Sequence, residues 1–117
     1  MHEMSVAMNI WEMAQEAASR AGCKHIVSLT VQYGQISGIM PEALKMAFQA
    51  LIQDTSEANA SLILEMIPLN LKCPFCGTQF SGKSSADIFM PCPKCGESFG
   101  HTVETGKELI LARIEAE

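Results

Sequence analysis

The chain has 117 residues, of which 48% are hydrophobic, and a formal net charge of -5 at pH 7. This length suits one modest domain, or one domain with a small satellite, built around one main core. The acidic balance argues against nucleic acid and anionic membranes as partners, and no apolar run approaches the ~18 residues that span a bilayer. The amino end also lacks a basic region followed by an apolar stretch, so we expect a cytoplasmic protein.

The first expected element is an amphipathic helix from Met4 to Ala21, because polar residues recur there every three or four positions. Gly22 follows its last turn as a left-handed cap. A strand is expected next over residues 27–33, where apolar and polar residues alternate and β-branched residues are frequent. The apolar face predicted for the helix consists of Met4, Ala7, Met8, Trp11, Ala14 and Ala18.

A second helix is expected from Pro41 to about Asp54, since proline suits the first helical position. Alternation over residues 62–67 predicts a second strand, and the order strand, helix, strand predicts a parallel pair. A third strand over residues 110–114 is expected to return to the same sheet. The sequence therefore predicts an α+β fold, with two helices packed on a small three-stranded mixed sheet. The face predicted for the second helix consists of Leu44, Ala47, Phe48 and Leu51.

Residues 72–101 differ in composition, being rich in Gly, Pro, Ser, Lys and Cys and too poor in apolar residues to build a core. The segment contains two similar knuckles, Cys73-Pro-Phe-Cys76-Gly and Cys92-Pro-Lys-Cys95-Gly. We interpret it as an inserted zinc-ribbon-like module. The predicted domains are then 1–71 plus 106–117 for the α+β part and 72–105 for the module.

Two CxxC pairs fifteen residues apart can bring four thiolates to one tetrahedral metal site. They predict a structural Zn(II), whose removal should unfold the module because the metal replaces missing hydrophobic stabilisation. A rubredoxin-like iron centre on the same knuckles is the alternative, and it would colour the protein red. The predicted zinc ligands are Cys73, Cys76, Cys92 and Cys95.

Two further residues could bear on that site. Cys23 remains as a spare thiol. His101 is interpreted as a surface histidine or one beside the site, with replacement of a cysteine ligand in some states as the alternative.

The sequence begins Met1-His2-Glu3. At position two, an imidazole, its own amide nitrogen and the terminal amine can form fused chelate rings in one plane, which suits Ni(II) or Cu(II). Glu3 or a nearby backbone group could fill the fourth position. From spacing alone, a frayed terminal histidine is the more common explanation of such a start.

Several motifs occur in one order along the whole chain: Met1-His2-Glu3-Met4-Ser5, Gly34-Gln35-Ile36-Ser37-Gly38-Ile39-Met40-Pro41-Glu42-Ala43-Leu44, the two knuckles, and Gly106-Lys107-Glu108-Leu109 with Ile114-Glu115. Together they closely resemble the HypA/HybF hydrogenase nickel-incorporation family. The resemblance implies a nickel metallochaperone that accepts Ni(II), its cargo, at the amino end and delivers it to the large-subunit precursor of NiFe hydrogenase.

The resemblance also implies roles for particular residues. His2 is the indispensable nickel ligand, the Met1 amine or backbone and the Glu3 backbone or side chain complete the sphere, and the zinc is structural. Family members often have an acidic residue just before Pro41, where this chain has Ile39-Met40. A nickel ligand from that loop is therefore not expected.

The implied partners are a nickel-handling GTPase and the hydrogenase large-subunit precursor, with urease maturation factors as a further candidate. We expect a monomer or weak homodimer and no enzyme activity, because no nucleophile with a base partner and no phosphate loop is visible. The alternative function is a zinc-ribbon protein-interaction adaptor with an inert amino end. Nickel stoichiometry separates the two functions.

Overall fold

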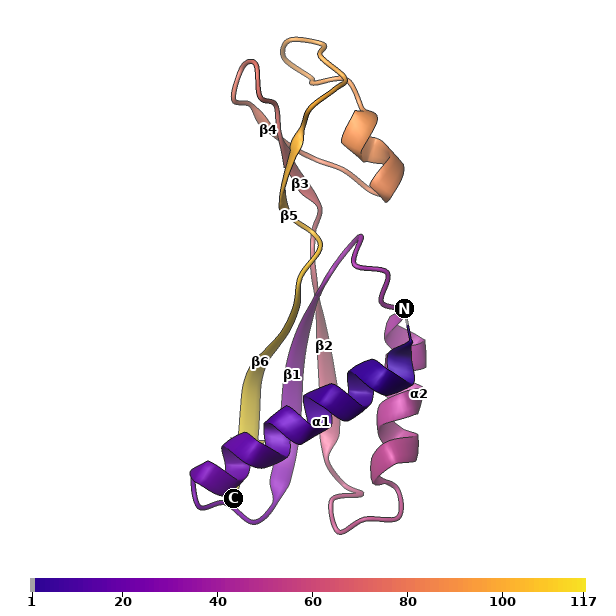
Figure 1. Ribbon diagram of the computed structural model, residues 1–117, viewed down its shortest axis with the longest axis vertical. Helices are drawn as coiled ribbons and strands as arrows, with labels where there is room; N and C mark the ends of the chain where they lie inside the picture. The colour runs from indigo at the N-terminus through magenta and orange to yellow at the C-terminus, as the bar shows by residue number, and fades with distance from the viewer. Residues whose placement is uncertain (1) are drawn as a thin grey trace. The chain divides into compact units, whose positions relative to one another are not determined.

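The computed structural model describes residues 2–117 (Figure 1). Its elements in chain order are α1 (Glu3–Arg20), β1 (Ile26–Gly34), α2 (Pro41–Ile52), β2 (Ser61–Ile67), β3 (Asn70–Lys72), β4 (Gln79–Ser81), the 3-10 helix η1 (Ser85–Phe89), β5 (Thr102–Thr105) and β6 (Leu109–Ala116).

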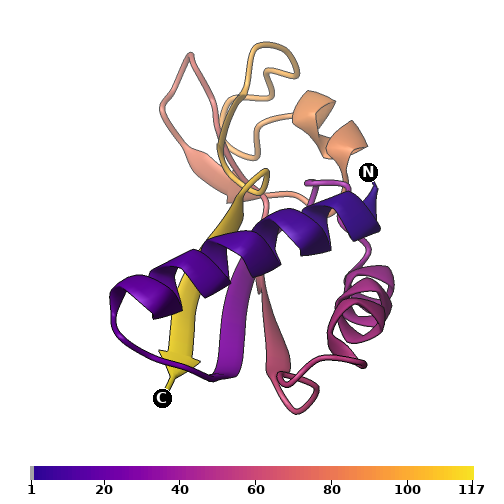
Figure 2. The ribbon, with the colours of Figure 1, turned by 60° about the horizontal axis from the view of Figure 1, so that its bottom comes forward.

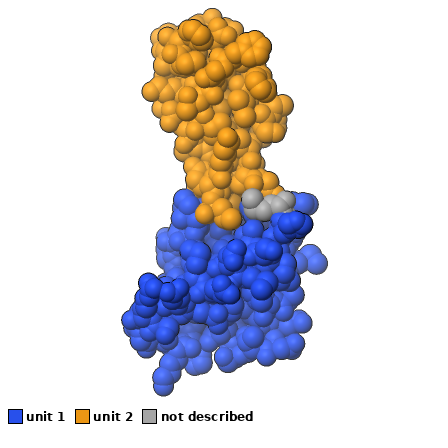
Figure 3. Space-filling model, in the orientation of Figure 1, with its two compact units in different colours: residues 1–32, 39–65, 110–117 blue, residues 33–38, 66–109 orange. Residues whose placement is uncertain are grey.

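The chain forms two compact units (Figure 3). Unit 1 comprises residues 1–32, 39–65 and 110–117, and unit 2 comprises residues 33–38 and 66–109. No helix among residues 2–117 combines the length and the apolar composition needed to cross a membrane.

The first sheet has the strand order β2-β1-β6. β1 and β6 run antiparallel, because the His25 N–H donates to the Glu117 carbonyl at 2.8 Å while the Gly34 N–H donates to the Glu108 carbonyl at 2.8 Å. β1 and β2 run parallel and are joined through α2, as Figure 1 shows. The predicted three-stranded mixed sheet is thus confirmed.

Both helices pack on one face of this sheet, and Figure 2 shows α1 crossing it. The Trp11 and Phe48 rings, one from each helix, meet edge to face with centroids 5.6 Å apart. Such a contact adds to the free energy gained by burying two large side chains. The core of unit 1 consists of Ile10, Trp11, Ala14, Ala18, Ile26, Leu29, Val31, Phe48 and Ile52.

The predicted face of α1 is wrong at its edge. Met4 and Met8 are 45% and 47% exposed, whereas Ile10 is buried. The buried stripe is centred close to Ala7, and at 3.6 residues per turn Met8 lies roughly 100° around the helix from Ala7. Packing on the core therefore does not explain these two methionines.

Unit 2 contains a second, antiparallel sheet of order β4-β3-β5, which the sequence did not predict. Leu71 of β3 pairs with Phe80 on one side and with Val103 on the other. With Leu69, Cys73 and Cys92, the residues Leu71 and Phe80 form a small core. The expectation that this part of the chain lacks a core is wrong. The predicted segment began at residue 72 and so left out Leu69 and Leu71, which belong to the core.

Among the described glycines, Gly34 in unit 2 has the closest neighbouring backbone. A Cβ added there would lie 2.0 Å from the Gly106 carbonyl oxygen, so no side chain fits without a backbone shift. The neighbouring Ile36 N–H donates to that same carbonyl at 2.8 Å. This contact fixes the segment after β1 against the turn before β6.

We therefore expect Gly34→Ala to lower the free energy of unfolding by about 3 kcal/mol or more, measured by urea denaturation. Gly38→Ala is the matched control, because a Cβ at Gly38 meets nothing within 4 Å and only its φ of +84° opposes substitution. That control should cost about 1 kcal/mol. Equal losses at the two glycines would contradict the proposed close approach.

Candidate metal sites

The two knuckles have the same backbone geometry. The Gly77 N–H donates to the Cys73 carbonyl and the Gly96 N–H to the Cys92 carbonyl, each at 2.9 Å. Gly77 and Gly96 have φ values of +75° and +81°, which explains why glycine follows each second cysteine. The first knuckle lies between β3 and β4 and the second between η1 and β5, and both lie in unit 2.

The structure brings the four predicted zinc ligands together. The sulfurs of Cys73 and Cys95 are 3.5 Å apart, as are those of Cys76 and Cys92. All four ligand atoms lie within 4.8 Å of one another, and in the described residues 2–117 no other group of three or more His, Cys, Asp or Glu does so. A tetrahedral ion with Zn–S bonds of ~2.3 Å requires sulfurs about 3.8 Å apart, which this cluster matches closely.

The electrostatics of the cluster also favour a cation. Thr78, through its hydroxyl and its backbone, lowers the pKa of Cys76 to about 6. The Glu97 N–H alone would lower the pKa of Cys95, but Cys73, desolvation and the other two cysteines raise that pKa to about 12. The four sulfurs therefore resist ionising together, and a bound dication removes this opposition.

His101 is not a surface residue. Its side chain is 7% exposed, its Nε2 lies 2.8 Å from the Met90 carbonyl oxygen, and its ring meets Phe80 edge to face with centroids 4.9 Å apart. Of the two expected positions, the structure rules out the surface and agrees with the one beside the site, because Phe80 packs in one core with Cys73 and Cys92. Cys23 is half-buried in unit 1 and does not belong to the four-sulfur group.

At the amino end, Met1 lies outside the described residues. His2 is exposed and precedes α1 in an extended conformation, and its side chain makes no capping hydrogen bond. Its carbonyl accepts the first hydrogen bond of the helix, from the Val6 N–H at 3.1 Å. The imidazole therefore plays no part in starting the helix.

Glu3 has a partner within unit 1. Its Oε2 accepts a hydrogen bond from the Met40 N–H at 3.3 Å, just before α2. Glu3 also places a negative charge in the first turn of α1, where the helix dipole favours it. The carboxylate thus connects the starts of the two helices.

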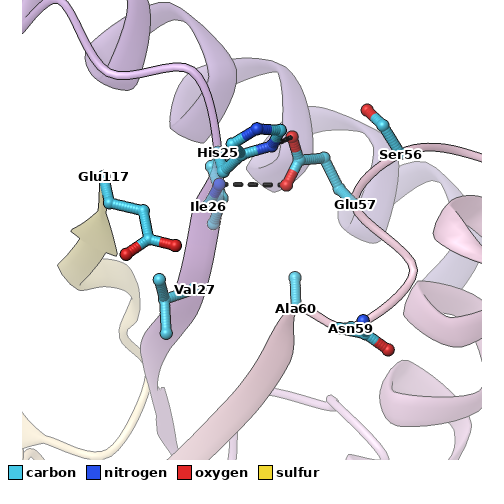
Figure 4. Close-up of a pocket in the computed structure, with 8 residues that line it drawn as sticks. All are labelled: His25, Ile26, Val27, Ser56, Glu57, Asn59, Ala60 and Glu117. Carbon is cyan, nitrogen blue, oxygen red and sulfur yellow. Dashed lines mark hydrogen bonds and ion pairs between the residues drawn. The ribbon is translucent and has the colours of Figure 1, made fainter.

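A surface hollow of about 300 Å³ in unit 1 was not predicted (Figure 4). Glu57 lines this hollow and makes two contacts there. Its Oε2 accepts a hydrogen bond from the Ile26 N–H at 3.0 Å, and its Oε1 lies 3.2 Å from His25 Nδ1. Both carboxylate oxygens are thus engaged in tying the loop before β2 to the start of β1. We interpret this pair as structural.

Comparison with known proteins decides the family. The family model described as "Hydrogenase/urease nickel incorporation, metallochaperone, hypA" matches residues 1–116. The chain belongs to this family. It is 35% identical to the hydrogenase maturation factor HypA of Solidesulfovibrio magneticus and 36% identical to that of Lawsonia intracellularis, with all of each chain covered in both pairs.

The fold is similar to that of solved structures. A solution structure of the nickel metallochaperone HypA from Helicobacter pylori matches with a TM-score of 0.67 at 23% identity, over 99% of this chain and 97% of the other. A second solution structure of a HypA protein matches with a TM-score of 0.71 at 22% identity, over 100% and 97% of the two chains. At this identity the likeness supports the fold alone, and the predicted α+β class and the predicted family are both confirmed.

We expect metal removal to unfold unit 2 selectively. Chelation at neutral pH should abolish the dispersed amide signals of residues 66–109 in an NMR spectrum while those of α1 and α2 persist, because structural zinc contributes roughly 10–16 kcal/mol in small modules. Cys73→Ser should have the same effect without chelator. Unit 2 signals that survive full metal removal would show that its small core is sufficient.

Proposed function

We propose that this protein binds Ni(II) at its amino end and delivers it for insertion into the large-subunit precursor of NiFe hydrogenase. His2 is the principal ligand, with donors from Met1 and Glu3, and a structural zinc is held by Cys73, Cys76, Cys92 and Cys95. The observation that carries the proposal is the way α1 begins: an exposed imidazole stands beside backbone N–H groups that the helix does not use.

The unused groups follow from helix geometry. The first four N–H groups of a helix have no partner within it, and here the first helical bond is made by Val6. The amides of His2 and Glu3 are therefore outside the hydrogen-bond ladder. An amide nitrogen can bind a metal only after losing its proton, so freedom from the ladder lowers the cost of recruiting it.

Glu3 serves this site through its backbone. Its carboxylate is held by the Met40 N–H at 3.3 Å, so using the carboxylate as a ligand would break that bond. The backbone nitrogen of Glu3 is next to His2 and is one of the unused amides. We therefore assign the side chain to holding the start of α1 and the backbone to the metal.

The cargo site and the zinc site suit different tasks. Four thiolates closed around one ion suit a permanent structural metal. A chelate at an exposed chain end suits transfer, because a partner can displace its ligands one at a time. Planar nitrogen donors also favour Ni(II) over Zn(II) in geometry, whereas supply and partners must discriminate against Cu(II).

The remaining parts of the proposal follow from the family. A nickel-handling GTPase is the expected partner, urease maturation factors are a second candidate, and action in the cytoplasm without enzymatic turnover is expected. The division into an α+β domain, 1–71 plus 106–117, and a zinc-binding module, 72–105, stays part of the proposal.

Calorimetric titration of Ni(II) into zinc-loaded protein with a native amino terminus tests the proposal. Wild type should bind about one nickel, and His2→Ala should weaken binding by at least roughly 100-fold, since loss of even an outer partner of a metal ligand costs 10–100-fold. Lower pH should weaken binding in wild type, because the imidazole and the amine must release protons.

Three further variants sharpen the test. A few residues added before Met1 should abolish binding like His2→Ala, whereas His25→Ala should bind nickel as wild type does. Glu3→Gln keeps an acceptor for Met40 and should stay within about threefold of wild type, because its backbone is unchanged. If all variants bind alike, or none binds, the amino end is inert and the zinc-module adaptor becomes the better account.

A further inference from the structure

His101 occupies an unusual position in unit 2. It is one of the few buried polar residues of the chain, and it lies six positions after Cys95, immediately before β5. Neither ring nitrogen of His101 has a cysteine sulfur as a hydrogen-bond partner among the described residues. Its contacts lead instead to the segments that carry the two knuckles.

The first contact leads to the second knuckle. Nε2 of His101 lies 2.8 Å from the carbonyl oxygen of Met90, two residues before Cys92. A carbonyl only accepts, so Nε2 carries the proton and donates it. The backbone that enters the second knuckle is therefore held by a side chain next to β5.

The second contact leads to the first knuckle. The His101 ring meets the Phe80 ring at 4.9 Å and 85°, an edge-to-face arrangement. Phe80 belongs to β4, the strand that leaves the first knuckle, and it packs in one core with Cys73 and Cys92. One buried imidazole thus contacts the exit of one knuckle and the entry of the other.

The other ring nitrogen, Nδ1, indicates that His101 does more than fill space in the core. Nδ1 is buried and has no hydrogen-bond partner among the described residues. A buried polar atom without a partner is costly, so a purely apolar residue would pack here at lower cost if packing were the only requirement. The donor on the opposite side of the ring is what phenylalanine would lack.

We propose that His101 is a positioning residue for the metal centre, which holds the second knuckle in register with the first and slows metal release. It acts through the Met90 carbonyl and the Phe80 ring, not by coordinating the ion. The inference rests on the proposed zinc site at the four cysteines and concerns its kinetics.

Two substitutions separate the contacts. His101→Phe keeps a ring against Phe80 and removes the donor to Met90, whereas His101→Gln supplies an N–H at a similar reach and removes the ring. Transfer of zinc from each protein to excess chelator at neutral pH should be roughly 5- to 30-fold faster for His101→Phe than for wild type. His101→Gln should stay within about threefold, and the controls His25→Phe and His25→Gln, on an exposed histidine of unit 1, should match wild type.

Amide hydrogen exchange in the zinc-loaded proteins distinguishes a local effect at the second knuckle from a general loss of stability. In His101→Phe the amide of Gly96 should exchange faster, while the equivalent amide of Gly77 should change much less. Unchanged zinc transfer, or equal acceleration at both knuckles, would overturn the proposal.

The remaining outcomes also decide between the claims. If His101→Phe does not hold zinc, His101→Gln decides alone: transfer like wild type supports the proposal and failure to hold zinc overturns it. If wild type itself holds no zinc, the zinc site of the proposed function fails, and the proposal for His101 fails with it; if wild type holds zinc and the His101 variants release it as wild type does, the proposal for His101 fails alone.

Discussion

The structure of unit 2 depends on one constraint: four cysteine sulfurs must lie together in one small volume. The cysteine sulfurs lie 3.5 Å apart in two cross-knuckle pairs, and the pKa values of Cys76 and Cys95 are driven to about 6 and about 12. Like charges at such distances oppose one another unless a cation lies between them. The glycine turns, the short sheet and the small core around Leu69 and Leu71 all serve to bring the knuckles together. We propose that a bound dication offsets this electrostatic cost and stabilises the unit.

Unit 1 presents the opposite design. Its core consists of aromatic and aliphatic residues, and the four-sulfur group lies in the other unit. Glu3 holds the start of α1 through Met40, while His2 stays exposed and outside the helical hydrogen bonds. In the proposed nickel site, this separation would let the cargo leave the amino end without unfolding unit 1.

The sequence predicted the parts of the structure that follow from local pattern. Alternation over residues 27–33 and the spacing of Leu44, Ala47 and Phe48 indicated β1 and α2, and the CxxC spacing indicated which sulfurs would meet. The second sheet was missed because strands of three or four residues are too short for alternation to be recognised. The hydrogen bond from Met40 to Glu3 joins residues that are distant in the sequence, and the burial of His101 depends on the packing around it. Only the three-dimensional structure reveals either feature.

We propose that one chain holds two metals through different chemistry: zinc by thiolates and nickel by nitrogen donors at the amino end. X-ray absorption at both metal edges, on protein loaded with one zinc and one nickel, tests this most directly. We expect four sulfur neighbours at ~2.3 Å around zinc and only nitrogen and oxygen neighbours around nickel. Sulfur at the nickel edge, or fewer than four sulfurs at the zinc edge, would contradict the account.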